Sequence, residues 1–255
     1  MHRFAHMLSM LLFAAGLTAC GDRFPDYNYK MTIHVGDDAY SSVRRVEQEE
    51  VSSIVDSTGS TVKTRMQGEA VIIDRPNGRT YYALIAKPGS PQYGAFAAEL
   101  ALMPMIEKAQ RGALENRMGR SQSGDRDLRA KDQQAMVAIE GPVELQRNIP
   151  VDRLRRHSGS GDPDFPGWPM FVTFADPSDP TTVREVDPED IGVSKITIEI
   201  IDEDVTTGIE ERLVWLDRYA SQRRRLSGNN SIVISRTNKD LAERIGTGNF
   251  SIGVD

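Results

Sequence analysis

The chain contains 255 residues with 31 basic and 37 acidic side chains, which give a formal net charge of −6. Hydrophobic residues make up 39% and charged residues 27% of the sequence, a balance that excludes disorder along the whole chain. The acidic pI of about 5.4 argues against nucleic acid as a partner, and the single cysteine excludes intrachain disulfides and cysteine-based metal clusters.

Residues 1–19 have the pattern of an export signal peptide. Arg3 supplies a short basic start, and an apolar run over residues 10–15 follows it. A permanent membrane-spanning helix needs about 20 apolar residues to cross a hydrocarbon core of about 30 Å. We therefore predict a signal that is removed from the mature protein.

The signal ends in Leu-Thr-Ala-Cys at residues 17–20, which resembles the lipobox of bacterial lipoproteins. The resemblance implies that the Cys20 sulfur carries a diacylglyceryl group, that cleavage falls just before Cys20, and that the new amino group carries an acyl chain such as palmitate. An ordinary signal peptide with a chance cysteine is the alternative. Gly21 stands where many inner-membrane lipoproteins have aspartate, so the resemblance favours the outer membrane.

Residues 20–26 are predicted to form a lipidated tether before a single folded domain over residues 27–255. Such a tether spans at most about 20 to 25 Å. We therefore expect the folded body to lie close to the membrane surface.

Alternating apolar residues predict several strands in the first half of the chain. The strongest local signal is a hairpin around Pro76-Asn77-Gly78, whose arms are apolar on both faces and are therefore expected at the centre of a sheet. The strands predicted in this half cover residues 27–35, 40–46, 62–66, 69–74 and 79–86.

Residues 94–113 are rich in helix-forming side chains and predict a helix that Pro104 kinks or divides. The following residues lose the apolar pattern, so a mobile polar loop is predicted around residues 115–134.

Apolar and polar residues alternate again in the second half of the chain, most clearly over residues 195–200. Thr207-Gly208-Ile209-Glu210 matches a capping box, which predicts a helix that ends at the arginines of residues 223–225. A short helix is expected at residues 241–245. The remaining predicted strands cover residues 143–145, 170–174, 183–186 and 232–234.

This order of elements predicts an α+β fold, mostly antiparallel β-sheet with two or three helices packed on it. The body also resembles a group of uncharacterised proteobacterial lipoproteins. The resemblance rests on residues 27–32, 68–71, 176–186 and 204–210, which contain no catalytic signature. It therefore implies a location and no activity.

Few residues outside the lipobox suggest chemistry. His34 and His157, the only histidines after residue 19, are expected on the surface. Ser60 and Lys63 spell S-x-x-K, but on a predicted strand residues three apart point to opposite faces. Gly119-Arg120-Ser121-Gln122-Ser123 lacks the final glycine of a nucleophile elbow.

Acidic residues cluster in four places, near Asp162, Asp176, Asp187 and Asp202. Several of these aspartates precede proline, which indicates turns, and calcium binding is the alternative. Phe165 and Trp168, interleaved with prolines, are the candidate surface contact for a protein or glycan partner. Packing over a sheet edge is the competing interpretation for these two aromatic residues.

Taken together, these patterns predict a membrane-anchored cell-envelope lipoprotein that faces the periplasm. We expect its body to be a non-catalytic binding or structural module, with no cofactor and no metal site, held to the membrane through lipid on Cys20. The alternatives are a lipid-anchored periplasmic hydrolase and a calcium-binding envelope protein.

Overall fold

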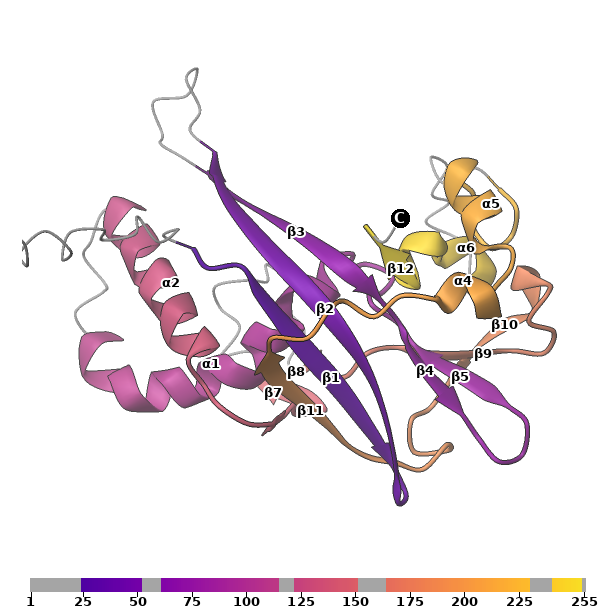
Figure 1. Ribbon diagram of the computed structural model, residues 1–255, viewed down its shortest axis with the longest axis horizontal. Coiled ribbons are helices and arrows are strands. Elements are labelled where there is room, and N and C mark those ends of the chain that lie inside the picture. The colour runs from indigo at the N-terminus through magenta and orange to yellow at the C-terminus, as the bar shows by residue number, and fades with distance from the viewer. Residues whose placement is uncertain (1–23, 52–60, 115–121, 151–163, 230–239, 254–255) are drawn as a thin grey trace, which may run out of the picture.

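The computed structural model describes residues 24–51, 61–114, 122–150, 164–229 and 240–253 (Figure 1). Its strands outweigh its helices and pair in antiparallel fashion, so the predicted α+β class is confirmed. The predicted strand over residues 232–234 lies outside the described residues.

A six-stranded sheet is the largest element of the fold. Its strands run in the order β12-β3-β2-β1-β11-β6, and the long strands at its centre are antiparallel neighbours. The predicted strands are present, but β2 and β3 are both longer than the alternation indicated. The bounds are β1 Tyr27–Val35, β2 Asp38–Val51, β3 Thr61–Glu69, β6 Val143–Glu144, β11 Val193–Ile201 and β12 Ser251–Ile252.

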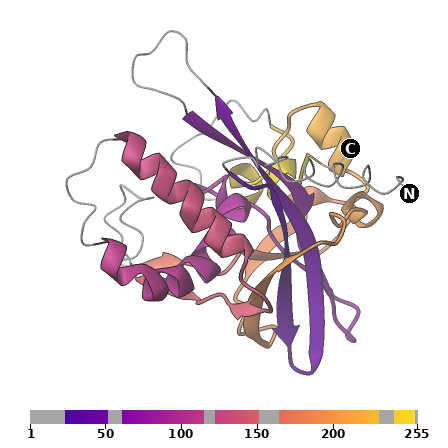
Figure 2. The ribbon, with the colours of Figure 1, turned by 60° about the vertical axis from the view of Figure 1, so that its left-hand side comes forward.

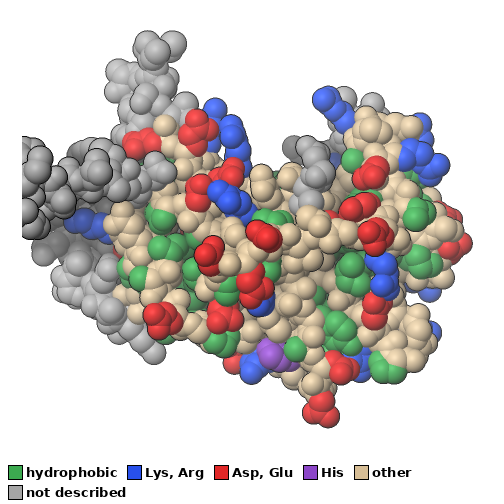
Figure 3. All heavy atoms as spheres, in the orientation of Figure 1, with side chains coloured by type: hydrophobic (Ala, Val, Ile, Leu, Met, Phe, Trp, Pro, Cys, Tyr) green, Lys and Arg blue, Asp and Glu red, His purple; other side chains and the backbone are tan. Residues whose placement is uncertain are grey.

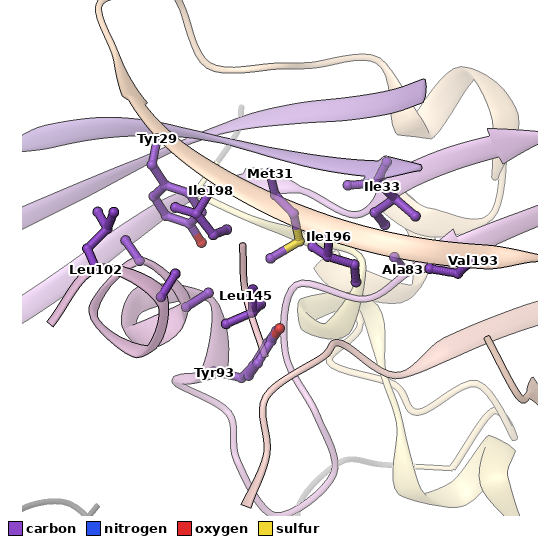
Figure 4. Close-up of a cluster of buried hydrophobic side chains, with 14 of the residues drawn as sticks. Tyr29, Met31, Ile33, Ala83, Tyr93, Leu102, Leu145, Val193, Ile196 and Ile198 are labelled. Atoms are coloured by element: carbon purple, nitrogen blue, oxygen red, sulfur yellow. The ribbon is translucent and has the colours of Figure 1, made fainter. Parts of the chain in front are cut away.

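The inner face of this sheet forms one side of the main core. In β1 every second side chain from Tyr27 to Val35 is buried, as the alternation predicted. These side chains, with Ile196 and Ile198 of β11, pack against the long helix α1, Tyr93–Leu114 (Figure 4). Pro104 lies inside α1 without dividing it.

A four-stranded sheet, in the order β10-β9-β5-β4, forms the middle layer of the molecule. The side chains of Val71, Ile73 and Tyr81 join the main core, whereas Tyr82 and Val172 face a second core on the other side. The prediction that the hairpin lies at the centre of a sheet is wrong for β4, which is an edge strand. Both faces are apolar because both are covered. The bounds are β4 Val71–Asp74, β5 Thr80–Ala83, β9 Phe171–Phe174 and β10 Val183–Val186.

The second core is closed by short helices from the C-terminal part of the chain. Its centre is aromatic, with the rings of Phe174, Trp215 and Phe250 5.7 to 5.8 Å apart. The single helix predicted after Thr207 is two helices, separated at residues 213–215, and the predicted helix near residue 241 is present. The bounds are η2 Pro180–Thr182, α4 Ile209–Arg212, α5 Leu216–Ser221, α6 Leu241–Arg244 and η3 Thr247–Asn249.

Helix α2, Gln122–Val137, replaces most of the loop predicted around residues 115–134. It lies beside α1 (Figure 2). Its inner face carries Ala130, Gln133 and Met136, and the Gln133 amide donates to the Glu99 carboxylate at 3.3 Å. Because Met136 is the only large apolar side chain among these three, the apolar periodicity is too weak to reveal the helix. A further two-stranded sheet pairs β7, Asn148–Pro150, with β8, Asp164–Pro166.

Candidate functional site

The predicted lipidation site, Cys20, lies outside the described residues, which begin at Phe24. Phe24 is 2% exposed and is therefore already part of the body. The Asp26 carboxylate accepts a hydrogen bond from the backbone N–H of Gln48 at 3.0 Å and lies 3.6 Å from the Arg45 guanidinium. Residues 24–26, which precede the predicted domain boundary at residue 27, are thus held against the body.

The predicted surface contact is only partly described. Phe165 belongs to β8, and its side chain lies outside the described residues. Trp168 is half-buried against the main core, and its indole N–H donates to the carbonyl of Leu145 at 2.7 Å. The Arg147 guanidinium lies 5.6 Å from the centre of the indole ring. Trp168 therefore has a packing role, and its use as a partner or glycan contact stays a prediction.

The other sequence candidates are not assembled into a site within the described residues. Lys63 is exposed on β3, and Ser60 lies outside the described residues. His34 is on the outer, polar face of β1, and His157 also lies outside the described residues.

The acidic clusters near Asp176 and Asp187 form turns, whereas Glu203 of the cluster near Asp202 forms an ion pair with Lys30. Asp179 accepts from the backbone of Thr181 at 2.9 Å and caps η2, and Asp176 accepts from the backbone of Ser178 at the same distance. Hydrogen bonds from Ser178 hold the pKa of Asp176 below its usual value. Residues 24–253, apart from the undescribed segments, contain no group of three or more metal-ligating side chains, so these residues give the calcium alternative no support.

Sequence reasoning missed a buried arginine beneath the first turn of α1. Arg44 is fully buried on β2, where its Nε donates to the carbonyl of Glu69 at 3.3 Å and its Nη1 lies 3.5 Å from the Tyr29 hydroxyl. That hydroxyl in turn donates to the carbonyl of Gly94. Among the described residues, no carboxylate forms an ion pair with Arg44, and its Nη2 has no hydrogen-bond partner.

Gly68 makes room for this arginine. Its φ of +144° is a conformation that side-chain-bearing residues rarely adopt, and a Cβ there would lie 2.8 Å from Cγ of Arg44. The alternation in β2 could have indicated the burial of Arg44, because Arg44 lies on the same face of the strand as the buried Ser42 and Val46. The burial of Arg44 depends on Gly68 of the neighbouring strand, which the local pattern of β2 does not contain.

Glu69, the last residue of β3, is the second missed group. Its carboxylate accepts from the backbone N–H groups of Gly208 and Ile209, both at 3.0 Å, and so caps α4 from a distant strand. Its carbonyl accepts from Ser42 and Arg44. Burial raises the pKa of Glu69 to about 7, against the effect of these two N–H donors.

Arg44 and Glu69 therefore form a junction between the two sheets, because β3 ends at Glu69 and β4 begins two residues later. The carboxylate of Glu69 can exchange a proton near neutral pH, but it is occupied by two backbone donors. The guanidinium is likewise turned toward a backbone carbonyl and a phenol. Hydrogen bonds at this junction fix the position of α4 relative to the two sheets.

Lys87, which precedes α1 in the chain, is a further side chain with a shifted pKa. The Lys87 ammonium donates to the carbonyl of Pro166 at 2.7 Å and lies 4.0 Å from the centre of the Tyr93 ring. Burial lowers the pKa of Lys87 to about 7. Lys87 thus fastens the start of α1 to the segment that contains Trp168.

No helix in the described ranges is both long enough and apolar enough to cross a bilayer. Comparisons with protein families, with characterised proteins and with solved structures find no match for this chain. The resemblance to bacterial lipoproteins therefore stays a prediction from the sequence.

Proposed function

We propose that this protein is a cell-envelope lipoprotein, anchored through acyl chains on Cys20 and exposed to the periplasm. Its body acts as a non-catalytic binding or structural module. The observation that carries the proposal is the position of the lipobox-like segment relative to the fold. The only cysteine of the chain stands four residues before Phe24, which is buried in the folded body.

This spacing would place a lipid anchor close to the body. Four residues reach at most about 14 Å, so lipid on Cys20 would hold the body directly at the membrane surface. Two or three acyl chains, at about 0.8 kcal/mol for each buried methylene, bind far more firmly than a single marginal chain. Attachment would therefore persist without a membrane-spanning segment.

The role of the buried polar groups supports a module that binds or supports other components rather than one that performs catalysis. Glu69 caps α4, Arg44 bonds the carbonyl of Glu69, and the hydroxyl of Tyr93 donates to the carbonyl of Gly167 at 2.8 Å. Each of these groups is committed to backbone partners that keep separate elements together.

Replacement of the cysteine tests the proposal. We expect Cys20→Ser to remove the protein from the membrane fraction of a bacterial host and to abolish the mass added by lipid. Thr18→Ala keeps a small residue before the cysteine and serves as the control, with retention and lipid mass unchanged. Wild-type retention of the Cys20→Ser variant, or an intact mass that includes Met1 and no lipid, would contradict the proposal.

A further inference from the structure

We propose that a group of arginines at the end of helix α5 is a docking surface for the headgroups of anionic phospholipids. The group consists of Arg218, Arg223, Arg224, Arg225 and Arg244, and it is called the arginine cluster below. The inference rests on the proposed function only for the location of the protein beside a bilayer. It adds a contact between the folded body and the membrane surface that is separate from the lipid on Cys20.

Positive charge is concentrated in one part of an acidic chain. Residues 215–250 contain seven basic and three acidic side chains, although the whole chain has a net charge of −6. Five of the seven basic residues form the arginine cluster. The other two, Arg236 and Lys239, belong to residues 230–239, which lie outside the described part of the chain and contain no acidic side chain. The space-filling view shows Lys and Arg side chains gathered over α5, so this part of the surface is positive (Figure 3).

The arginines of the cluster have no carboxylate partner among the described residues. Arg223, Arg224 and Arg244 are exposed, and Arg225 donates to the carbonyl of Arg244 at 2.8 Å, which joins the two segments of the cluster. By contrast, the following arginines elsewhere in the fold form ion pairs with carboxylates: Arg45, Arg65, Arg75, Arg147 and Arg212. The exposed guanidinium groups of the cluster can therefore bind an anion from outside the chain.

The backbone at Arg223 is a second feature of the cluster. Its φ of +51° is the only positive φ of a residue other than glycine in the described part of the chain. Its N–H donates to the carbonyl of Ala220 at 3.0 Å, and the N–H of Arg224 donates to the carbonyl of Tyr219 at 2.9 Å. These two hydrogen bonds form a Schellman motif, in which glycine is the usual residue at the position that Arg223 occupies.

The Schellman motif also shows that these side chains are not needed to end the helix. The last carbonyls of α5 accept hydrogen bonds from backbone N–H groups, so no guanidinium group has to cap them. Helix α5 has only six residues, which give a weak dipole for a positive side chain to complement. Because arginine is less stable than glycine in this left-handed conformation, its presence favours a use of the side chain outside the fold.

The chemistry of the cluster suits phosphate groups in a lipid surface. Each guanidinium presents a planar pair of N–H donors that can bind two phosphate oxygens. The proposed anchor keeps the body beside a bilayer, whose anionic lipids carry phosphate groups at high density. Each basic side chain near such a surface strengthens binding about fivefold. The acidic remainder of the chain is repelled by the same surface, which favours contact through the arginine cluster.

Vesicle binding by the full chain without its lipid tests this proposal. Cys20→Ser is the parent for all variants, so the anchor makes no contribution, and failure of the proposed anchor would not change the result. The parent is mixed with vesicles of phosphatidylcholine alone or of equal parts of phosphatidylcholine and phosphatidylglycerol, and bound protein is measured by cosedimentation. Binding to phosphatidylcholine alone is subtracted, which removes any contribution of residues 1–19.

The double variant Arg223→Gly/Arg224→Gln removes two charges of the cluster. We expect it to bind the anionic vesicles roughly 10- to 30-fold more weakly than the parent. Its melting temperature should not fall, because glycine suits the φ of residue 223. The matched control, Arg79→Gln/Arg184→Gln, removes the same charge from two exposed arginines that also lack ion pairs among the described residues. It should bind within about twofold of the parent.

Equal weakening by the two double variants would show that only net charge matters and would overturn the docking surface. Binding of the parent to anionic vesicles no stronger than to phosphatidylcholine would also overturn it and would point to an acidic protein as the partner. We expect sodium phosphate to release the parent no better than sodium chloride at the same ionic strength. Specific release by phosphate would instead show a site for the free anion.

Discussion

Single residues at the sheet junction show two ways in which this fold buries a charged side chain. Arg44 is accommodated by a neighbour without a side chain, Gly68, and by a carbonyl and a phenol that accept its hydrogen bonds. Glu69 is accommodated by two backbone donors at the start of α4. A buried carboxyl group also has a second option, because it can take up a proton and lose its charge.

This option makes the stability of the protein depend on the protonation of Glu69. Burial raises its pKa in the folded state from 4.5 to about 7, so between these pH values the folded protein holds a proton that the unfolded chain releases. The stabilisation is complete below the unfolded pKa and is lost as the pH rises through 7. We expect the free energy of unfolding to fall by roughly 1 to 3 kcal/mol between pH 5 and pH 8 because of this group.

Urea denaturation of the wild type and of Glu69→Gln at the two pH values measures this contribution. The glutamine variant should have a smaller decrease in unfolding free energy over this range, whatever its absolute stability. Glu185→Gln, at an exposed position on β10, is the control and should keep the wild-type pH dependence. Identical pH dependence of wild type and Glu69→Gln would show that Glu69 has no raised pKa.

At the scale of elements, α4 shows how tertiary contacts replace a local signal. The capping box predicted at Thr207 is wrong, since the N-cap is Gly208 and makes no side-chain cap hydrogen bond. The side chain of Glu69 supplies the acceptors instead. The neighbouring Thr206 is tied to β2, where its hydroxyl accepts from the backbone N–H of Val43 at 2.8 Å.

The two threonines should therefore differ when each is replaced by alanine. We expect Thr207→Ala to change the free energy of unfolding by less than about 0.5 kcal/mol, because it removes no cap. Thr206→Ala should cost about 1 to 3 kcal/mol, because it leaves a buried N–H without its acceptor. Thermal or urea denaturation measures the free energy of unfolding of both variants. A larger loss of stability for Thr207→Ala than for Thr206→Ala would show that Thr207 does cap the helix.

At the scale of the whole molecule, the four-stranded sheet joins the two cores. Its side chains alternate between them, with Ile73 and Tyr81 on one side and Tyr82 and Val172 on the other. Loss of this sheet would expose both cores at once. The fold is therefore expected to unfold as one cooperative unit although it contains two separate hydrophobic clusters.

The two tryptophans provide a probe for each core. Trp168 packs against the main core and Trp215 lies in the second one, so Trp168→Phe and Trp215→Phe each leave a single reporter. Within each variant, the urea transition followed by fluorescence should coincide with the transition followed by circular dichroism. A fluorescence transition that precedes the loss of secondary structure in either variant would show that one core opens independently.

The class of the fold and most of its strands could be predicted from the sequence, because a strand with one buried face repeats every two residues. Residues 27–35 are an example, since the alternation of buried side chains in β1 matches the sequence pattern throughout. Helix α2 could not be predicted in this way, because Ala130 and Gln133 on its inner face give no such periodicity.

The residues of the candidate site could also be predicted only in part. Cys20 was identified by sequence alone, because the lipobox resemblance depends on neighbours in the chain, and it stays a prediction. Arg44 and Glu69 could not be assigned roles, since their partners lie on other elements. Glu69 caps a helix that begins about 140 residues later.

The sequence by itself determined the alternation of β1 and the sheet-rich class of the fold. The tertiary structure alone decided that β4 is an edge strand with both faces covered, that Glu69 caps α4, and that Arg44 is buried against Gly68. The reason is physical: periodicity shows that a side chain must be covered, whereas the identity of the covering group depends on segments that only folding brings into contact.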